Sequence, residues 1–348
     1  MIYLIFYLFI FIISILNKKK SFKDDFAFKF LFFILVIFIG FRHQVGADWF
    51  NYLSHVENQF NIDLSLNYER RGFLYLLIVW FASNIFGGIY FVNLILALIF
   101  CYGLYRFAEY LDSNRYSLLM IAFPVLIVII GLGFSRQSAA VGLFMLALVE
   151  LLKGNNIKYI LLVLMAALFH LSAIILIPIV FLFVVQKKYI LYPIIIIVIY
   201  FTFNFLFLPN IDYYNDSYIK REYNSSGALI RILLIMLPAL IFLKFKIHMV
   251  TNVKSLKIWR FFSYAILTSF LLLLLSPSST SVDRLSFYLI PLQLFVFSNL
   301  DRLPTKFNGH KLGDTFVFLF GLIVLSAWIL FSDHSKYWMP YDSYLFNI

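Results

Sequence analysis

Long apolar stretches recur along the whole chain, separated by short polar segments. Many reach the roughly 17–25 residues with which an α-helix spans a bilayer. Backbone groups in lipid must be paired within the segment, so runs of this length predict helices. The pattern predicts an all-α, polytopic membrane protein of about 12–14 membrane-embedded helices. The apolar segments lie near 2–16, 26–41, 72–86, 89–105, 117–134, 138–152, 159–170, 171–185, 189–208, 229–243, 258–276, 285–298 and 314–331.

Two parts of this map leave alternatives open. In residues 159–185, Pro178 and the polar pair His170 and Ser172 indicate a break, with one long tilted helix as the alternative. Segments 72–86 and 89–105 lie between an outer and an inner loop. Two full crossings would return the chain to the same side, so only one of these segments can cross the membrane. One of them must be re-entrant, peripheral or fused with its neighbour, and the pair Gly87–Gly88 is the expected bend.

Composition agrees with this pattern. The chain is 63% hydrophobic and 13% charged, with a mean hydropathy of +0.92, whereas soluble domains carry about 45–50% apolar and about 25% charged residues. We expect one integral membrane domain over 1–348. The net charge of +11 is scattered between apolar runs, which favours a role in membrane topology over nucleic-acid binding. Cys101 is the single cysteine, so no internal disulfide can form.

The basic residues also predict the orientation of the chain. Lys and Arg concentrate in cytoplasmic loops, and assigning six loops to the cytoplasm places most of the 28 Lys and Arg there. These loops are 17–29, 106–116, 150–158, 186–188, 244–260 and 299–314. Because Lys18, Lys19 and Lys20 follow the first apolar stretch, the N-terminus is expected outside.

A few polar residues collect on the predicted outer side, where basic residues oppose the orientation rule. Ionisable groups at the membrane are costly and indicate function. Arg42 follows the second helix, Arg136 lies between two apolar helices, and Arg284 opens a late helix beside Asp283. Each has an alternative interpretation without a functional role. Arg42 can form a structural pair with Asp48, and Arg136 can be an arginine that snorkels to the outer interface. Asp283 can cap the helix that Arg284 opens.

His170 falls at the same predicted level. A lone histidine on an apolar segment is often a packing residue, but its neutral form near pH 7 also suits general-base work. Together the three arginines and His170 predict a basic, outward-facing cavity that suits a lipid-linked diphosphate. The sequence contains no Walker A loop and no zinc-type His/Cys motif, so we expect no cofactor and no metal requirement.

The order and spacing of these residues carry a family resemblance. The ordered set is Arg42…Gly46-x-Asp48…Tyr52, Tyr68-Glu69, Ser135-Arg136-Gln137-x-x-Ala140, Ala167-x-x-His170-x-Ser172-Ala173, Gly227…Arg231…Pro238, Asp283-Arg284…Tyr288 and Pro340-Tyr341. In this set, which spans about residues 40–345, the chain resembles the EpsG-like family of bacterial polysaccharide polymerases, relatives of the Wzy O-antigen polymerases. It departs at Ala47, where a small polar residue is expected, and at Arg70-Arg71, which replace a proline.

The resemblance implies a helical glycosyltransferase of the lipid-linked-donor (GT-C-like) kind at the periplasmic face of the inner membrane. Such an enzyme moves a growing O-antigen, capsule or exopolysaccharide chain from its polyprenyl diphosphate carrier onto a new lipid-linked repeat unit. Donor and acceptor are then both polyprenyl-diphosphate-linked oligosaccharides, and a chain-length regulator is a further expected partner.

The expected roles follow from this chemistry. Arg136, Arg284 and Arg42 would stabilise the leaving diphosphate, and His170 would be the base, with Asp48 or Glu69 as alternatives. The remaining candidates would bind sugars or substrate: His43, Trp49, Tyr52, Glu69, Gln137, Asp283 and Tyr288.

Three other functions share these features. An O-antigen ligase would use the same arginines and histidine, but it is expected to carry a longer loop than 209–228. A membrane acyltransferase would place its histidine toward the inner side. A flippase or transporter of lipid-linked oligosaccharide would tend to show internal repeats, and none is apparent.

Overall fold

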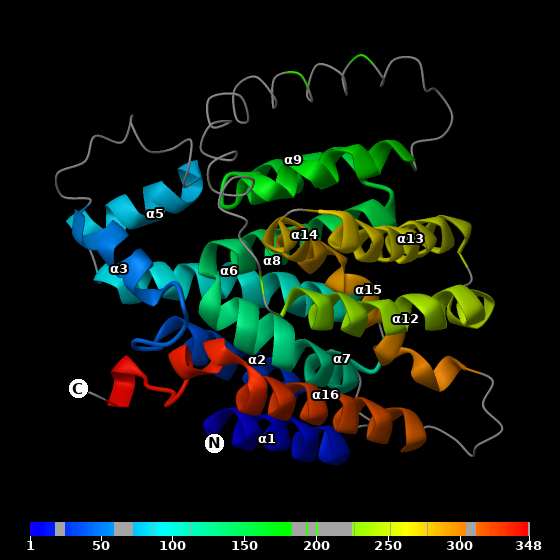
Figure 1. Ribbon diagram of the computed structural model, residues 1–348, viewed down its shortest axis with the longest axis horizontal. Helices are drawn as coiled ribbons and strands as arrows, with labels where there is room; N and C mark the ends of the chain where they lie inside the picture. Colours follow the sequence, from blue (N-terminus) through cyan, green and yellow to red (C-terminus); the bar gives the residue numbers. More distant parts are fainter. Residues whose placement is uncertain are drawn as a thin grey trace.

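The fold is that of a computed structural model (Figure 1), which describes residues 1–17, 25–58, 72–85, 87–111, 113–182, 193, 200, 225, 227–250, 252–276, 278–303 and 311–346. Within these residues the protein is helical and contains no strand, only one isolated bridge between Arg42 and Ser343. The predicted all-α class is confirmed.

The helices follow the apolar segments closely. Their bounds are α1 (Ile2–Asn17), α2 (Phe26–Gly40), α3 (Trp49–Glu57), α5 (Phe73–Asn84), α6 (Gly88–Leu111), α7 (Arg115–Ala122), η3 (Phe123–Gly131), α8 (Ser135–Lys153), α9 (Asn156–Ala167), η4 (Leu171–Leu182), α12 (Ala228–Met249), α13 (Val253–Leu275), α14 (Ser279–Ser286), η8 (Phe287–Leu289), α15 (Ile290–Ser298), η9 (Leu300–Arg302), α16 (Lys311–Phe331), η10 (Asp333–Tyr337) and η11 (Tyr344–Phe346). The predicted segment 189–208 lies outside the described residues, apart from positions 193 and 200.

Five of the described helices are long and apolar enough to cross a membrane, namely α6, α8, α12, α13 and α16. The chain is therefore a multi-pass membrane protein. Helix α8 lies at the centre of the bundle (Figure 1) and is buried along most of its length. It packs very closely on α6, since a Cβ atom at Gly103 would lie 2.1 Å from the carbonyl oxygen of Gly142. Small residues allow such backbone approach between membrane helices.

The break expected near His170 is confirmed. Helix α9 ends at Ala167, the chain turns, and η4 folds back against α9. The Tyr159 hydroxyl donates to the Leu176 carbonyl oxygen at 2.5 Å, which fixes the two segments as a hairpin. His170 therefore lies in the turn rather than in the middle of a long helix.

The ambiguity over residues 72–105 is also resolved by helix length. Helix α6 has 24 residues, about 36 Å at 1.5 Å per residue, which spans the roughly 30 Å hydrocarbon core. Helix α5 has 12 residues, about 18 Å, which is too short to cross. Helix α5 is the peripheral member of the pair, as its position at the edge of the bundle shows (Figure 1).

The connecting loops separate into two groups at opposite ends of the bundle. At one end, Asn114 N donates to Ser298 O at 3.1 Å, and Arg302 Nη1 donates to Met249 O at 3.3 Å. Asn114, Met249 and Arg302 belong to loops predicted inside, and Ser298 is the residue directly before one of these loops. At the other end, which we call the Arg136 end, α6 and α8 begin and α9 finishes (Figure 1). The described parts of the loops predicted outside meet there, as the contacts Leu74–Leu168, Arg284–Gln137 and Arg231–Asp283 show.

Candidate functional site

Arg136 stands in the first turn of α8, at the tight connection from the π-helix η3. Its guanidinium carbon lies 5.3 Å from the ring centre of Tyr75 and 6.0 Å from that of Tyr52. These tyrosines come from the peripheral helices α5 and α3, and a cation over an aromatic face is attracted by the ring quadrupole. The side chain is half-buried, so two aromatic rings hold a positive charge at the edge of the bundle.

Arg284 lies against the same turn of α8. Its Nη1 donates to Gln137 Oε1 at 3.1 Å, and Gln137 Nε2 donates to the Arg284 carbonyl oxygen at 2.8 Å. The guanidinium carbon also lies 4.0 Å from the ring centre of Phe134. Gln137 therefore joins α14 to α8 through two hydrogen bonds and places Arg284 beside the turn that carries Arg136.

His170 completes the group. Its imidazole is half-buried, and the positive charges of Arg136 and Arg284 both act on it. Its Nδ1 lies 2.6 Å from the Ser172 hydroxyl, which lies 3.0 Å from the Tyr288 hydroxyl. The structure therefore brings Arg136, His170 and Arg284 together at one end of the bundle.

The N-terminus of α5 packs directly against the His170 turn. Leu74 N donates to Leu168 O at 3.1 Å. Gly72, with φ +86°, makes this approach possible, because a Cβ there would lie 2.5 Å from the same carbonyl oxygen. This contact places Tyr75, and with it the Arg136 side chain, next to His170.

Asp283 forms an ion pair that the sequence reading did not predict. Its carboxylate accepts from Arg231 Nε and Nη2, both at 2.7 Å, and the two side chains are 4% and 18% exposed. The Ser225 hydroxyl bonds to both partners. This bidentate pair fixes α14 to the start of α12 and leaves Asp283 little capacity for substrate.

Arg42 is placed differently from the other two arginines. It is 1% exposed, and its guanidinium donates to Val45 O, Ile39 O, Asn93 Oδ1 and Ser135 Oγ at 2.6–3.1 Å. No ion pair joins Arg42 to Asp48 among the described residues, so the structural pair considered from sequence is not what holds it. Arg42 instead ties α2 and α6 to Ser135, the residue before Arg136.

Asp48 and Tyr52 lie close to Arg136. The Asp48 carboxylate is half-buried and makes no hydrogen bond or ion pair within the described part of the chain, and its charge acts on Arg136 and Tyr52. Burial and the Asp48 charge raise the pKa of Tyr52, so this residue stays a neutral phenol. Asp48 thus provides an uncommitted carboxylate near the arginines.

The remaining candidates, His43 and Glu69, are not placed in the His170 cluster by the structure. His43 Nδ1 lies 2.6 Å from the Tyr90 hydroxyl, and its ring lies against Trp49. It belongs to an aromatic group formed by the start of α6 and the C-terminal segment rather than to the His170 cluster. Glu69 lies outside the described residues.

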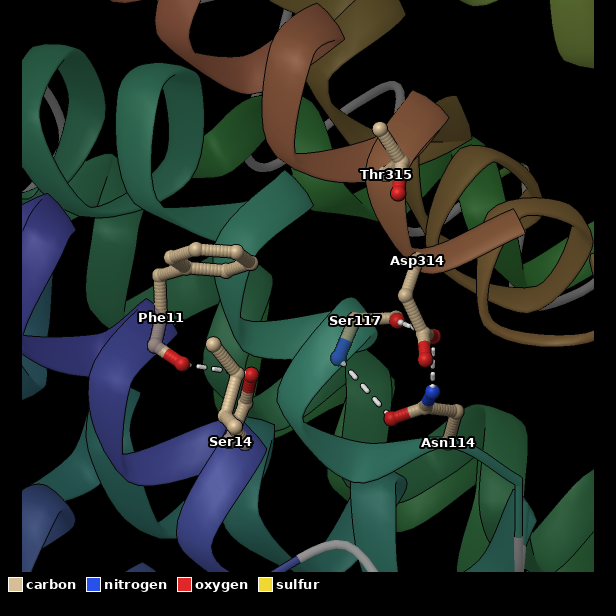
Figure 2. A pocket seen from close by; sticks show the side chains of 7 residues that line it. Phe11, Ser14, Asn114, Ser117, Asp314 and Thr315 are labelled. Carbon is tan, nitrogen blue, oxygen red and sulfur yellow. Dashed lines mark hydrogen bonds between the residues drawn. The ribbon is translucent and has the colours of Figure 1, made fainter. Parts of the chain in front are cut away.

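A cavity of about 310 Å³ is lined by residues of α1, α7 and α16 and by Asn114 (Figure 2). It lies at the opposite end of the bundle, where Asn114 N donates to Ser298 O. The only charged side chain among its lining residues is Asp314, which accepts hydrogen bonds from Asn114 and Ser117. A carboxylate repels phosphate, so this cavity does not suit a lipid diphosphate. Within the described residues, no three His, Cys, Asp or Glu side chains come together as metal ligands.

The family model described as EpsG matches residues 25–343, which is nearly the whole chain. The chain belongs to the EpsG family. EpsG members are Wzy-like polysaccharide polymerases, and the matched range includes every residue of the arginine–histidine cluster. The EpsG resemblance predicted from the ordered motifs is confirmed. No curated protein and no solved structure matches the chain.

Several contributors to this candidate site were not candidates from the sequence. They are Tyr75, Asn93, Ser135, Ser172, Ser225 and Arg231. Ser135, Ser172 and Arg231 belong to the ordered motifs, and that was the only signal that could have selected them. Tyr75 and Asn93 sit in apolar helices whose patterns give no indication of a role.

Proposed function

We propose that this chain is a polysaccharide polymerase that joins polyprenyl-diphosphate-linked oligosaccharide repeat units at the periplasmic face of the inner membrane. The observation that carries the proposal is that half-buried Arg136 and Arg284 lie beside His170, at the end of the bundle predicted to face outward. The Arg284–Gln137 hydrogen bond and the Leu74–Leu168 contact hold them there. The family supplies the polymerase class, and this geometry supplies the reason for a diphosphate-linked donor.

The transfer makes one bond and breaks one. An acceptor hydroxyl of the new repeat unit attacks the anomeric carbon of the donor glycan, and the bond from that carbon to the diphosphate oxygen breaks. The electron pair leaves with the polyprenyl diphosphate, so negative charge grows on its oxygens. Arg136 and Arg284 stabilise that charge, because fixed positive groups act strongly where water is excluded.

The other residues divide between binding and positioning. The ring and neutral hydroxyl of Tyr52 lie beside Arg136, and in this proposal Tyr52 contacts substrate there. Arg42, Gln137 and Asp283 act as positioning residues, since their polar groups are already engaged with the protein. The acceptor proton passes to a base, and His170, Asp48 and Glu69 are the three groups that the sequence offers.

A gel of surface polysaccharide from a deletion strain tests this function. Complementation with the wild-type gene should restore a ladder of glycan lengths, whereas His170→Ala should leave only single repeat units. Arg106→Ala is a matched control, because Arg106 is exposed on α6 in an ion pair with Glu109. A deletion that also removes the single-repeat band would contradict the proposal and point to a flippase or ligase.

A further inference from the structure

The hydrogen-bond chain His170–Ser172–Tyr288 has a direction, and that direction determines what His170 can do. The hydroxyl of Ser172 lies between the histidine Nδ1 at 2.6 Å and the tyrosine hydroxyl at 3.0 Å. A serine hydroxyl has one proton, so it can donate to only one of these neighbours. If it donates to Nδ1, the neutral imidazole carries its proton on Nε2. If it donates to Tyr288, Nδ1 must carry the proton.

The surroundings of Tyr288 decide between these two directions of donation by Ser172. It is 1% exposed, and Ser172 is its only hydrogen-bond partner within the described residues. If Ser172 donated to Tyr288, the phenolic proton would be buried without an acceptor, which costs about 1–3 kcal/mol. If Tyr288 donates to Ser172, every proton in the chain has an acceptor. In this arrangement Tyr288 donates a hydrogen bond to Ser172, and Ser172 donates one to the Nδ1 atom of His170.

Burial and the surrounding charges remove the third possibility, a cationic imidazole protonated on both nitrogens. Burial disfavours the charged form of His170 most, and the positive charges of Arg136 and Arg284 oppose its protonation further. Among the described residues, the charge of Asp48 acts on Arg136, Tyr52 and Arg42, and the carboxylate of Asp283 is paired with Arg231. The imidazole is therefore neutral, with one proton to place.

We infer that His170 carries its proton on Nε2 and donates it as a hydrogen bond to the leaving diphosphate, with Ser172 and Tyr288 as positioning residues. This inference rests on the proposed function. His170 then works beside Arg136 and Arg284 as a third donor and does not accept the acceptor proton. That proton passes to a carboxylate, and Asp48 is the uncommitted one near the arginines.

Three substitutions at position 170 separate a donor from a base. The amide nitrogen of glutamine can occupy the place of Nε2, and that of asparagine the place of Nδ1; neither amide is a base. His170→Gln should keep polymerisation within about tenfold of wild type, whereas His170→Asn and His170→Ala should lose about 10²–10³-fold, as for an oxyanion donor. If glutamine is as inactive as alanine while wild type polymerises, His170 is not the donor and only this inference fails.

A spectroscopic measurement tests the proton position independently of activity. In purified protein labelled with ¹⁵N-histidine, the signals lost in His170→Gln assign His170. We expect a pyridine-type Nδ1 and a protonated Nε2, and Ser172→Ala should shift the Nδ1 signal. A protonated Nδ1 in the wild-type protein would overturn the inference. A failure of the proposed function would appear instead as wild type that does not polymerise.

Discussion

Replacing Arg136 with alanine should lower the polymerisation rate by about 10³-fold, the scale on which arginines contribute where phosphate charge develops. Arg136 is the one arginine of the cluster held between two aromatic rings, Tyr52 and Tyr75. The loss should appear in the rate of chain growth rather than in binding of the donor, because charge grows on the diphosphate as its bond breaks.

Arg136→Lys is the matched variant. Lysine keeps the charge but loses the planar fork that grips phosphate at two points, so we expect an intermediate rate. The thermal unfolding temperature of each variant in detergent controls for folding. We expect it to stay near that of the wild type, because neither substitution removes Tyr52 or Tyr75. An alanine variant that is equally stable and polymerises normally would show that Arg136 does not stabilise the leaving group.

Reversing one charge of the Arg231–Asp283 pair should have the largest effect on stability. Breaking a buried ion pair by changing one partner costs about 3–5 kcal/mol, and both single variants, Arg231→Asp and Asp283→Arg, place like charges together. Because Asp283 precedes Arg284, the same change displaces Arg284 from Gln137 and lowers polymerisation. The thermal unfolding temperature and the rate of chain growth should therefore both fall in the single variants.

The exchanged double variant, Arg231→Asp with Asp283→Arg, restores opposite charges and should recover much of both losses. The exposed pair Arg106–Glu109, with side chains 42% and 37% exposed, is the control, because such pairs contribute roughly 0–1 kcal/mol. Its exchange should change neither readout. If the Arg231–Asp283 double variant is no better than the single variants, the pair does not position α14 in the way we describe.

The helices were largely predictable from sequence because apolar runs of membrane length permit one regular structure. The short helices α3 and α14 were missed, since they lie in loops and mix polar with apolar residues. Helix α5 was predicted as a helix, but its peripheral place follows from its observed end at Asn84. Hydropathy alone does not give that boundary.

The site was predictable only where a residue is out of place for its environment. Arg136, His170 and Arg284 stood out because charge or polarity interrupts apolar sequence at one predicted level. The partner of Asp283 lies 52 positions away in another helix, and no local spacing indicates such a contact. For the same reason, sequence could not show that Arg42 turns inward to Asn93 and Ser135 while Arg136 stays half-buried.

The measurement closest to the central claim is chain growth in liposomes that contain only the purified protein and the lipid-linked repeat unit extracted from the deletion strain. We predict a ladder of glycan lengths, with one polyprenyl diphosphate released for each linkage formed, and no ladder with Arg136→Ala. A repeat unit that stays single, whether or not it crosses the bilayer, would contradict the assignment of this chain as the polymerase.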